Sequence, residues 1–450
     1  MNGLFRTACG MWQGAKLSPM SLVISNAELI WTGTEELRGV SLRSDRGVVT
    51  SIVEQPAPAD DTLDAAGCIV TPGLVNAHHH LLQSAFRTYP DARHVPMDEW
   101  LTAMGAAYRR AGVDAELCAA AAAVGAAEGL LCGVTTVADH HLTWPAGADH
   151  TAMATATAEA LLALGGRLVF VRGTAGDDPV EAADSVEALA AALPLGDHVQ
   201  LAVGPAGVHS DGRPTFDALG EVAGRLGLRR RTQAHEQVDV ERATARYGAR
   251  PLQLLADWGW LASDVTIAHL CGITAEEADL LAHAGVSATH APGCDVVSGW
   301  GVAPVGALLD RGVRVGLGTS GGGSNDAGHL LADARLAMQV APLSPLPGRR
   351  VDARTVLTMA TAGSAAGIGR PELGCLAVGN ASDLCCWDVH GVADAGVADP
   401  LAGLVWASPG RRPRHVVVAG RVVVRDGRLV TADEQALACR LRLLLAGDRH

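Results

Sequence analysis

Short apolar runs alternate with longer Ala- and Leu-rich stretches through the middle of the chain. The short runs are bounded by Gly or polar residues, which is typical of buried parallel strands. The stretches between them, for example 116–131, 151–164 and 186–193, have the length and composition of helices. The predicted strands are 69–75, 134–139, 167–172, 199–205, 229–235, 265–269, 286–290 and 313–319. This alternation predicts an α/β fold with a parallel sheet, closed as a barrel or open and doubly wound, and eight strands favour a (β/α)8 TIM-like barrel.

Both ends of the chain show a different pattern. Short β-rich runs separated by Asn, Gly and Asp turns follow Met20, and runs of the same kind return at 376–384 and 415–422, with a hairpin expected at Ala419-Gly420. Residues 1–19 carry little pattern, so the functional fold starts near Met20, and the sequence leaves open whether translation starts at Met1 or Met20. We expect the following division: 1–19 N-terminal extension, 20–66 with 372–435 as one composite β domain, and 67–371 as the catalytic barrel.

Three consecutive histidines stand at the end of the first apolar run. Side chains two positions apart share one face of a strand, so His78 and His80 are expected to point together while His79 points away. Two neutral imidazoles that converge on one point suit a divalent metal such as zinc. A solvated histidine cluster in a loop, or the remnant of a histidine tag, is the alternative.

Polar residues also end most of the other predicted strands. Barrel enzymes keep their chemistry at the carboxyl ends of the strands, so these groups are expected to converge on one mouth. Taken singly, each histidine could equally be a hydrogen-bonded structural residue. The groups in question are Asp139-His140-His141, His209, His235-Glu236, His269, His290 and Thr319-Ser320.

The stretch around the three histidines resembles the HxH signature of the amidohydrolase superfamily, P-G-x-(V/I)-(N/D)-x-H-x-H. The residues that match are Pro72, Gly73, Asn76, His78 and His80. Segments 135–142, 300–304 and 316–326 resemble the triazine hydrolase and aminohydrolase branch, which includes chlorohydrolases and heterocycle deaminases. The resemblance implies a (β/α)8 barrel and a small β-sandwich built from both termini.

Two positions depart from the usual family pattern. Ser320 stands where most members carry a metal-binding Asp, although some triazine hydrolases have a hydroxyl residue there and place the acid/base on a Glu after strand five, as Glu236 is here. Gln233 stands where the strand-five metal histidine is usual, and a neutral amide is a weaker zinc ligand than imidazole. His235 lies two residues on, and we expect either that it replaces the missing ligand by a local shift or that the metal site is weak or empty.

The resemblance then implies a set of roles. Each of these residues could instead have a structural role: Glu236 could be a surface residue at a helix N-terminus, the tryptophans could lie in the core or at its rim, and Asn325-Asp326 could cap the following helix. The catalytic residues would be Glu236, His269, His290 and Ser320; the metal ligands His78, His80, His235 and His269; and the substrate contacts Gln83, His141, Trp144, Gln233, Trp300, Asn325 and Asp326.

The net charge and the composition exclude some classes of binding partner. The net charge of −13 argues against nucleic acid or an anionic membrane, and no run of about 18 apolar residues is present for a membrane span. The ten cysteines are scattered without a CxxC pair, which favours reduced thiols in the cytoplasm. The glycines at 321–323 lack the Gly-Lys-Ser/Thr ending of a phosphate loop. We expect a small-molecule heterocyclic substrate and, by default, a homodimer.

The leading hypothesis is a hydrolase that uses water activated by zinc, or by iron, to remove an amino or halide substituent from a purine-, pyrimidine- or s-triazine-type ring. The alternative is an enzyme on the same scaffold that has lost its metal and catalyses cyclisation, elimination or rearrangement, which Gln233 and Ser320 favour. A third possibility is a catalytically silent binding protein. His78, His80, His269 and Glu236 weigh against it, because folding does not require such a group of side chains.

Overall fold

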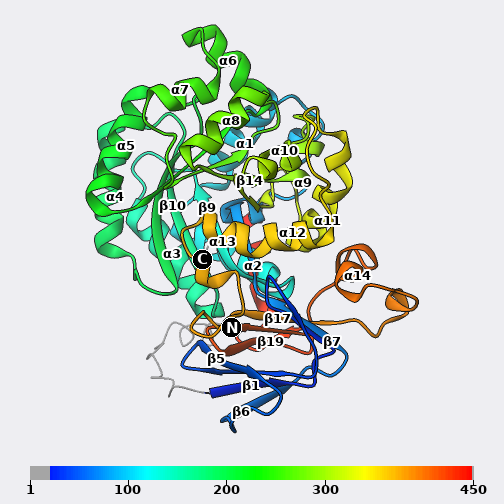
Figure 1. The fold of residues 1–450 in the computed structure, drawn as a ribbon. Coiled ribbons are helices and arrows are strands. Elements are labelled where there is room, and N and C mark those ends of the chain that lie inside the picture. Colours follow the sequence, from blue (N-terminus) through cyan, green and yellow to red (C-terminus); the bar gives the residue numbers. More distant parts are fainter. Residues whose placement is uncertain (1–20, 448–450) are drawn as a thin grey trace, which may run out of the picture.

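The molecule is organised around a closed parallel sheet (Figure 1). The computed structural model describes residues 21–447, so the expected extension 1–19 and the choice between Met1 and Met20 lie outside the described residues. The strands, in sheet order, are β15 (Arg314–Leu317), β14 (Ser287–His290), β13 (Val265–His269), β12 (Arg229–Ala234), β11 (Val199–Pro205), β10 (Arg167–Thr174), β9 (Val134–His141), β8 (Leu74–His80) and β16 (Ser320–Gly321). The predicted (β/α)8 barrel is confirmed.

The eighth barrel strand is bent, and the bend closes the barrel. Its first part, β15, pairs with β14, and its second part, β16, pairs with β8. At the bend, the Gly318 N–H donates to the carbonyl of His290 and the Thr319 N–H to the carbonyl of His78. A Cβ on Gly318 would lie 2.6 Å from that His78 carbonyl oxygen, so only glycine lets the two strands approach this closely.

Helices surround the barrel, and local sequence signals set their ends. Asp114, Asp149 and Asp178 accept hydrogen bonds from backbone N–H groups of the first turns of α2, α3 and α4. The helices of the barrel region are α1 (Met97–Ala111), α2 (Ala115–Leu131), α3 (His150–Leu164), α4 (Pro179–Ala192), α5 (Arg213–Leu226), α6 (Gln237–Tyr247), α7 (Pro251–Asp257), α8 (Ala275–Ala284), α9 (Pro292–Val297), α10 (Val305–Asp310), α11 (Leu330–Val340), α12 (Ala353–Thr358) and α13 (Ser364–Gly367).

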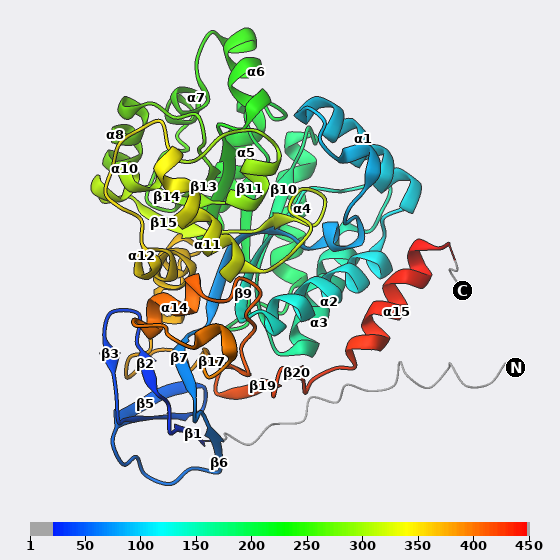
Figure 2. The same ribbon diagram turned by 90° about the vertical axis from the view of Figure 1, so that its right-hand side faces the viewer.

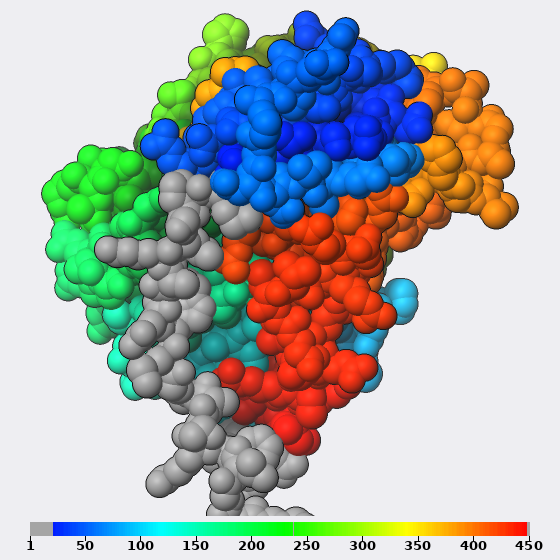
Figure 3. Space-filling model, turned by 90° about the horizontal axis from the view of Figure 1, so that it is seen from below, coloured from blue at the N-terminus to red at the C-terminus, as the bar shows by residue number. Residues whose placement is uncertain are grey.

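Two further sheets pack face to face beside the barrel. Their shared core includes Leu22 and Leu42 from one sheet and Ile30 and Leu384 from the other. Figure 3 shows that the N-terminal segments, in blue, and the C-terminal segments, in orange and red, lie side by side on this face. The first sheet is β5 (Val48–Val53), β4 (Ser41–Asp45), β1 (Ser21–Ser25) and β6 (Asp61–Asp64); the second is β20 (Arg428–Leu429), β19 (Arg421–Arg425), β18 (His415–Val418), β17 (Leu384–Asp388), β7 (Cys68–Pro72), β2 (Leu29–Trp31) and β3 (Glu36–Leu37). The expected hairpin at Ala419-Gly420 joins β18 to β19.

The predicted strand 69–75 is two strands in the structure. Its first part is β7, which pairs with β17 and β2 in the second terminal sheet, and its last part opens the barrel strand β8. Gly73 separates them, and a Cβ there would lie 2.4 Å from Thr135 Oγ1. One apolar run therefore serves two sheets. We propose that the barrel begins at Leu74 rather than at residue 67.

An ion pair joins the barrel to the terminal sheets. Arg167 on β10 donates from Nε and Nη2 to the two carboxylate oxygens of Asp383 at 2.8 and 3.0 Å, and both side chains are buried. The remaining helices are α14 (Pro400–Trp406) and α15 (Glu434–Leu445), of which α15 packs along α2 (Figure 2). Between residues 21 and 447, none of the helices combines the length and the apolar character that crossing a membrane requires.

Candidate active site

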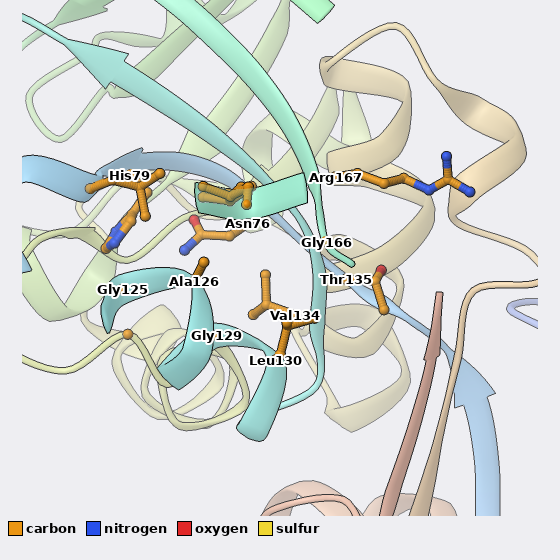
Figure 4. A pocket seen from close by; sticks show the side chains of 14 residues that line it. Asn76, His79, Gly125, Ala126, Gly129, Leu130, Val134, Thr135, Gly166 and Arg167 are labelled. Carbon is orange, nitrogen blue, oxygen red and sulfur yellow. The ribbon is translucent and has the colours of Figure 1, made fainter. Parts of the chain in front are cut away.

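His78 and His80 lie at the carboxyl end of β8 with their rings together. The ring centroids are 4.9 Å apart, and His80 Nδ1 lies 2.6 Å from the carbonyl oxygen of His140. A carbonyl can only accept, so His80 carries its proton on Nδ1 and its Nε2 is left as a free acceptor. His79 points the other way, with Nδ1 3.0 Å from Thr319 Oγ1. Figure 4 shows His79 and Asn76 facing Gly125 and Ala126 of α2, around a cavity of about 20 Å³, room for about one water molecule.

His269 approaches the same point from the end of β13. Its ring lies 5.2 Å from that of His78, and its Nδ1 lies 2.6 Å from a carboxylate oxygen of Asp295. Its other nitrogen, Nε2, lies 3.1 Å from Gln233 Oε1 and 3.8 Å from Glu236 Oε1. Although burial alone lowers the pKa of His269, the negative charges of Asp295 and Glu236 raise it overall.

The side chains that face this point are of the kinds that bind a divalent metal ion. His78 Nε2 is buried and has no hydrogen-bond partner among the described residues. A buried nitrogen without a partner destabilises the folded state unless an ion or another atom binds to it. Burial, together with the neighbouring histidines, lowers the pKa of His78 well below its usual value, and burial lowers that of His80 to about 4. Both rings are therefore neutral, the form that binds metals. The residues that could hold the ion are His78, His80, His269 and Gln233.

His235, expected to replace the missing histidine ligand, points elsewhere. Its Nε2 lies 3.4 Å from a Glu277 carboxylate oxygen, and Arg250 Nη2 donates to its Nδ1 at 3.4 Å. The backbone at His235 has left the strand conformation, with φ at 60°, so its side chain does not share the face of Gln233. The structure therefore places Gln233, and not His235, beside His269.

Glu236 is a buried carboxyl group beside this cluster. Only 4% of the residue is exposed, so it is not a surface residue at the start of α6. Its Oε2 has no hydrogen-bond partner among residues 21–447 and lies 3.9 Å from His209 Nδ1. Burial raises the pKa of Glu236, while the nearby His269 and His209 act in the opposite direction. A carboxyl group with a raised pKa is suited to proton transfer near neutral pH.

Asp295 links the histidines of two strand ends, and our sequence analysis did not find it. Its Oδ1 faces His269, and its Oδ2 lies 3.3 Å from Nδ1 of His290. Burial would raise the pKa of Asp295, but the two histidines lower it to about 2. The only sequence signal was its position, five residues after the strand-seven histidine. Ser320 lies nearby on the cavity wall, where it accepts a hydrogen bond from the Ser324 hydroxyl at 3.3 Å.

Cys294 also approaches this group. Its Sγ and ligand atoms of His269 and Asp295 all lie within 4.8 Å of one another. Burial raises the pKa of the Cys294 thiol to about 12, and metals bind the thiolate. The Nδ1 atom of His269 is also engaged by Asp295. Asp295 is therefore a hydrogen-bonded support for His269, and Cys294 lies beside the pair with its Sγ near the hydroxyl of Ser298.

Two adjoining cavities lead to the cluster. The inner cavity, of about 250 Å³, is lined by Glu236, His209, Gln233, Ser320 and Trp300 among others. The outer cavity, of about 580 Å³, is lined by residues that include His141, Trp144, Trp100, Met104 and Tyr108. Gln83 lines both, and its Oε1 accepts the N–H of Gly323 at 3.1 Å.

Asn325 and Asp326, expected to contact the substrate, line neither cavity. Asn325 Nδ2 donates to Asp333 and to the carbonyl of Thr319. Asp326 pairs with Arg93 at 2.6 Å. Both residues therefore hold neighbouring loops together, and neither caps α11, whose N-cap is His329.

The chain resembles a protein family and several known proteins over most of its length. The model of the Amidohydrolase family matches residues 69–423. A 5-methylthioadenosine/S-adenosylhomocysteine deaminase of Halobacterium salinarum is 33% identical, covering 87% of this chain and 90% of its own. An 8-oxoguanine deaminase of Pseudomonas aeruginosa is 32% identical, covering 86% and 90%. The crystal structure of a mutant atrazine chlorohydrolase from Arthrobacter aurescens TC1, complexed with zinc and atraton, is 33% identical with a TM-score of 0.90, covering 94% of this chain and 100% of that one.

Proposed function

Because the chain belongs to the amidohydrolase family, we propose that it is a zinc-dependent hydrolase that removes an amino or halide substituent from a nitrogen-rich heteroaromatic ring. The observation that carries this proposal is the convergence of His78, His80 and His269 beside a buried Glu236 at the carboxyl ends of the barrel strands. The deaminases and the chlorohydrolase that resemble this chain support the same reaction class.

The three histidines and Gln233 would hold the ion. When bound, zinc would make a water molecule acidic enough to lose a proton near pH 7. His80 is oriented by the carbonyl of His140, and His269 by Asp295, so neither ring has to reorganise to act as a ligand. Iron could fill the same donor set, because imidazole suits both metals.

Glu236 would move the proton. The oxygen of water bonds to the ring carbon that carries the leaving substituent, and Glu236 takes a proton from that water. Glu236 then passes that proton to the leaving amino group, which departs as ammonia, while the other proton of the water moves to a ring nitrogen and the ring carbon becomes a carbonyl. With a halide as the leaving group, the halide departs as the anion and Glu236 releases its proton to solvent. His290, whose Nδ1 lies 3.3 Å from Asp295 Oδ2, and the Ser320 hydroxyl on the wall of the inner cavity would stabilise the charge that develops on the ring.

Assay of purified protein with metal analysis tests the proposal. We expect about one zinc per chain, together with release of ammonia from 5′-methylthioadenosine, adenine or 8-oxoguanine, or of chloride from a chloro-s-triazine, for at least one of these compounds. Turnover should disappear after chelation and return with zinc. A metal-loaded protein that hydrolyses none of these rings would contradict the proposal.

The second candidate is the metal-free enzyme with a non-hydrolytic acid/base reaction. It is favoured by Gln233 and Ser320, which replace stronger metal ligands, and by the contact between Glu236 and His269, which could act as an acid/base pair alone. Full activity in protein with less than a tenth of an equivalent of metal would select this candidate.

The proposed setting is a homodimer in the cytoplasm that acts on a small molecule. The cysteines that the structure describes are all free thiols, as a reducing compartment would keep them. The dimer rests on the frequency of twofold assemblies among soluble enzymes. The negative net charge of −13 supports neither nucleic acid nor membrane as partner.

A further inference from the structure

The inner and outer cavities adjoin, since they share part of their lining, and their far ends differ. The catalytic end is polar, because Glu236, His209 and Ser320 belong to the inner cavity only. At about 250 Å³ it lies below the range of roughly 300–1,000 Å³ that is usual for small-molecule sites. The outer cavity adds about 580 Å³. The residues that line both cavities are His80, Gln83, Trp100, Leu101, Leu142 and Ala175.

The walls of the outer cavity are mainly apolar. They include the side chains of Trp100, Met104, Tyr108 and Trp144, together with Leu82, Val113 and Pro145. The charged residues among them are Arg109, which is exposed, and Asp139, one of whose carboxylate oxygens accepts the N–H of Leu81 at 2.7 Å. Apolar walls of this size favour an apolar occupant.

The two tryptophans of this wall are held in place. Trp100 Nε1 donates to the carbonyl of Gly323 at 3.0 Å, and Trp144 Nε1 donates to that of Gly173 at 2.8 Å. The ring of Trp144 also lies 4.5 Å from that of His141. A preformed aromatic wall binds a flat or bulky apolar group with little loss of side-chain entropy.

We propose that the physiological substrate carries a bulky, uncharged, apolar group on the side of its ring opposite to the leaving substituent. This inference rests on the proposed function, because Glu236 and His269 fix where the leaving substituent must lie. With that substituent in the inner cavity, the far side of the ring lies toward the residues that line both cavities, such as His80 and Trp100, and faces the outer cavity. A group on the leaving nitrogen itself would instead enter the small polar end.

Matched compounds test the proposal. Four compounds separate the effect of the position of an added group from the effect of its charge. They are adenine, adenine benzylated on N9, adenine benzylated on its exocyclic amine, and the N9 derivative with a carboxylate on the benzyl ring. A chloro-diamino-s-triazine and its bis-alkylamino form repeat the test on a second ring. We expect kcat/KM for the far-side apolar compound to exceed that of the bare ring at least tenfold, on whichever ring is hydrolysed. Equal or higher values for the bare, leaving-side or carboxylate compound would overturn the proposal.

A variant that fills the outer cavity gives a second measurement. Gly105 on α1 lines this cavity, and a Cβ there would meet only Arg109 Nη1, at 3.4 Å. Gly105→Leu should therefore reduce the preference for the far-side compound over the bare ring at least fivefold. The control is Gly224→Leu, at an exposed position on α5 where a Cβ meets nothing within 4 Å, which should keep the wild-type preference. An unchanged preference in folded Gly105→Leu protein would overturn the proposal.

Binding separates this inference from the proposed reaction. Calorimetry with the Glu236→Gln variant should show the far-side compound binding at least tenfold more tightly than the bare ring. If that result is found while wild-type protein releases no ammonia or chloride, the proposed reaction is wrong and the description of the substrate stands. If the reaction occurs but the bare ring binds as tightly, the inference alone is wrong.

Discussion

His269 Nδ1 lies 2.6 Å from Oδ1 of Asp295. A carboxylate at this distance keeps the ring proton on Nδ1 and aims Nε2 of His269 at the point where His78 and Gln233 also face. One buried contact therefore decides both the tautomer and the direction of a proposed metal ligand.

Asp295→Asn should weaken zinc binding by about 10- to 100-fold, because an amide holds the His269 ring less firmly and removes a negative charge near the ion. Competition with a fluorescent chelator measures the change. Asp257→Asn, on α7 with Gln253 as its partner, is the control and should keep wild-type affinity. Equal affinities in both variants would show that Asp295 does not support the metal site.

His235→Asn should leave the zinc content near one per chain, since the His235 ring contacts Glu277 and Arg250 rather than the proposed metal ligands. Asn is chosen because it tolerates the positive φ of this position. His80→Asn is the comparison and should lose most of its zinc. Metal analysis of the two purified proteins decides, and loss of zinc from His235→Asn would return His235 to the ligand set.

Glu236→Gln should lower kcat by about 10²- to 10⁴-fold, because the amide cannot accept the proton from water. Zinc content and thermal stability should stay close to those of the wild type, which elemental analysis and a melting curve check. Glu221→Gln, an exposed position on α5, should be fully active. A Glu236→Gln enzyme with wild-type turnover would remove Glu236 from the mechanism.

Arg167→Met should destabilise the protein by about 3–5 kcal/mol, because it leaves the buried carboxylate of Asp383 without its cation. Urea unfolding measures the loss. In the double variant Arg167→Met/Asp383→Asn we expect part of the stability to return, since no unpaired charge stays buried. If the double variant loses more stability than the two single variants lose when their losses are added, this explanation is contradicted.

Stability should fall as the pH rises from about 4 to about 7, in part because of Asp333. Burial raises the pKa of this side chain to about 7 in the folded protein. Within this pH window the folded state keeps a proton that the unfolded state has lost. The free energy of unfolding therefore falls by at most about 1.4 kcal/mol for each unit that the pH rises.

Asp333→Asn cannot ionise and should flatten this pH dependence, as urea midpoints at pH 5, 6 and 7 would show. Its stability at pH 5 should be lower than that of the wild type. The Asp333 carboxyl group accepts a hydrogen bond from Asn325 Nδ2, and the amide of Asn has one acceptor oxygen fewer to take that hydrogen bond. A variant curve parallel to that of the wild type would assign the effect to other groups.

The sequence alone determined the barrel and much of its mouth. Apolar runs that alternate with helical stretches have few ways to bury their surface, so the fold class followed from the pattern. The positions of His78 and His80 followed from strand geometry, because β8 continues as extended backbone through both residues. Glu236 and His269 were found because parallel strands bring their carboxyl ends to one rim.

Only the tertiary structure decided which way the remaining side chains point. Side chains two positions apart share a face only while the backbone stays extended. The chain leaves the strand after Ala234, so this rule gave the wrong direction for His235. Asp295 carries no local motif, and its role arises because it lies between His269 and His290, which come from different strands. The split of residues 69–75 between two sheets likewise depends on β17, more than three hundred residues further along the chain. Local patterns report periodicity and burial, whereas contacts between distant segments depend on how the whole chain closes.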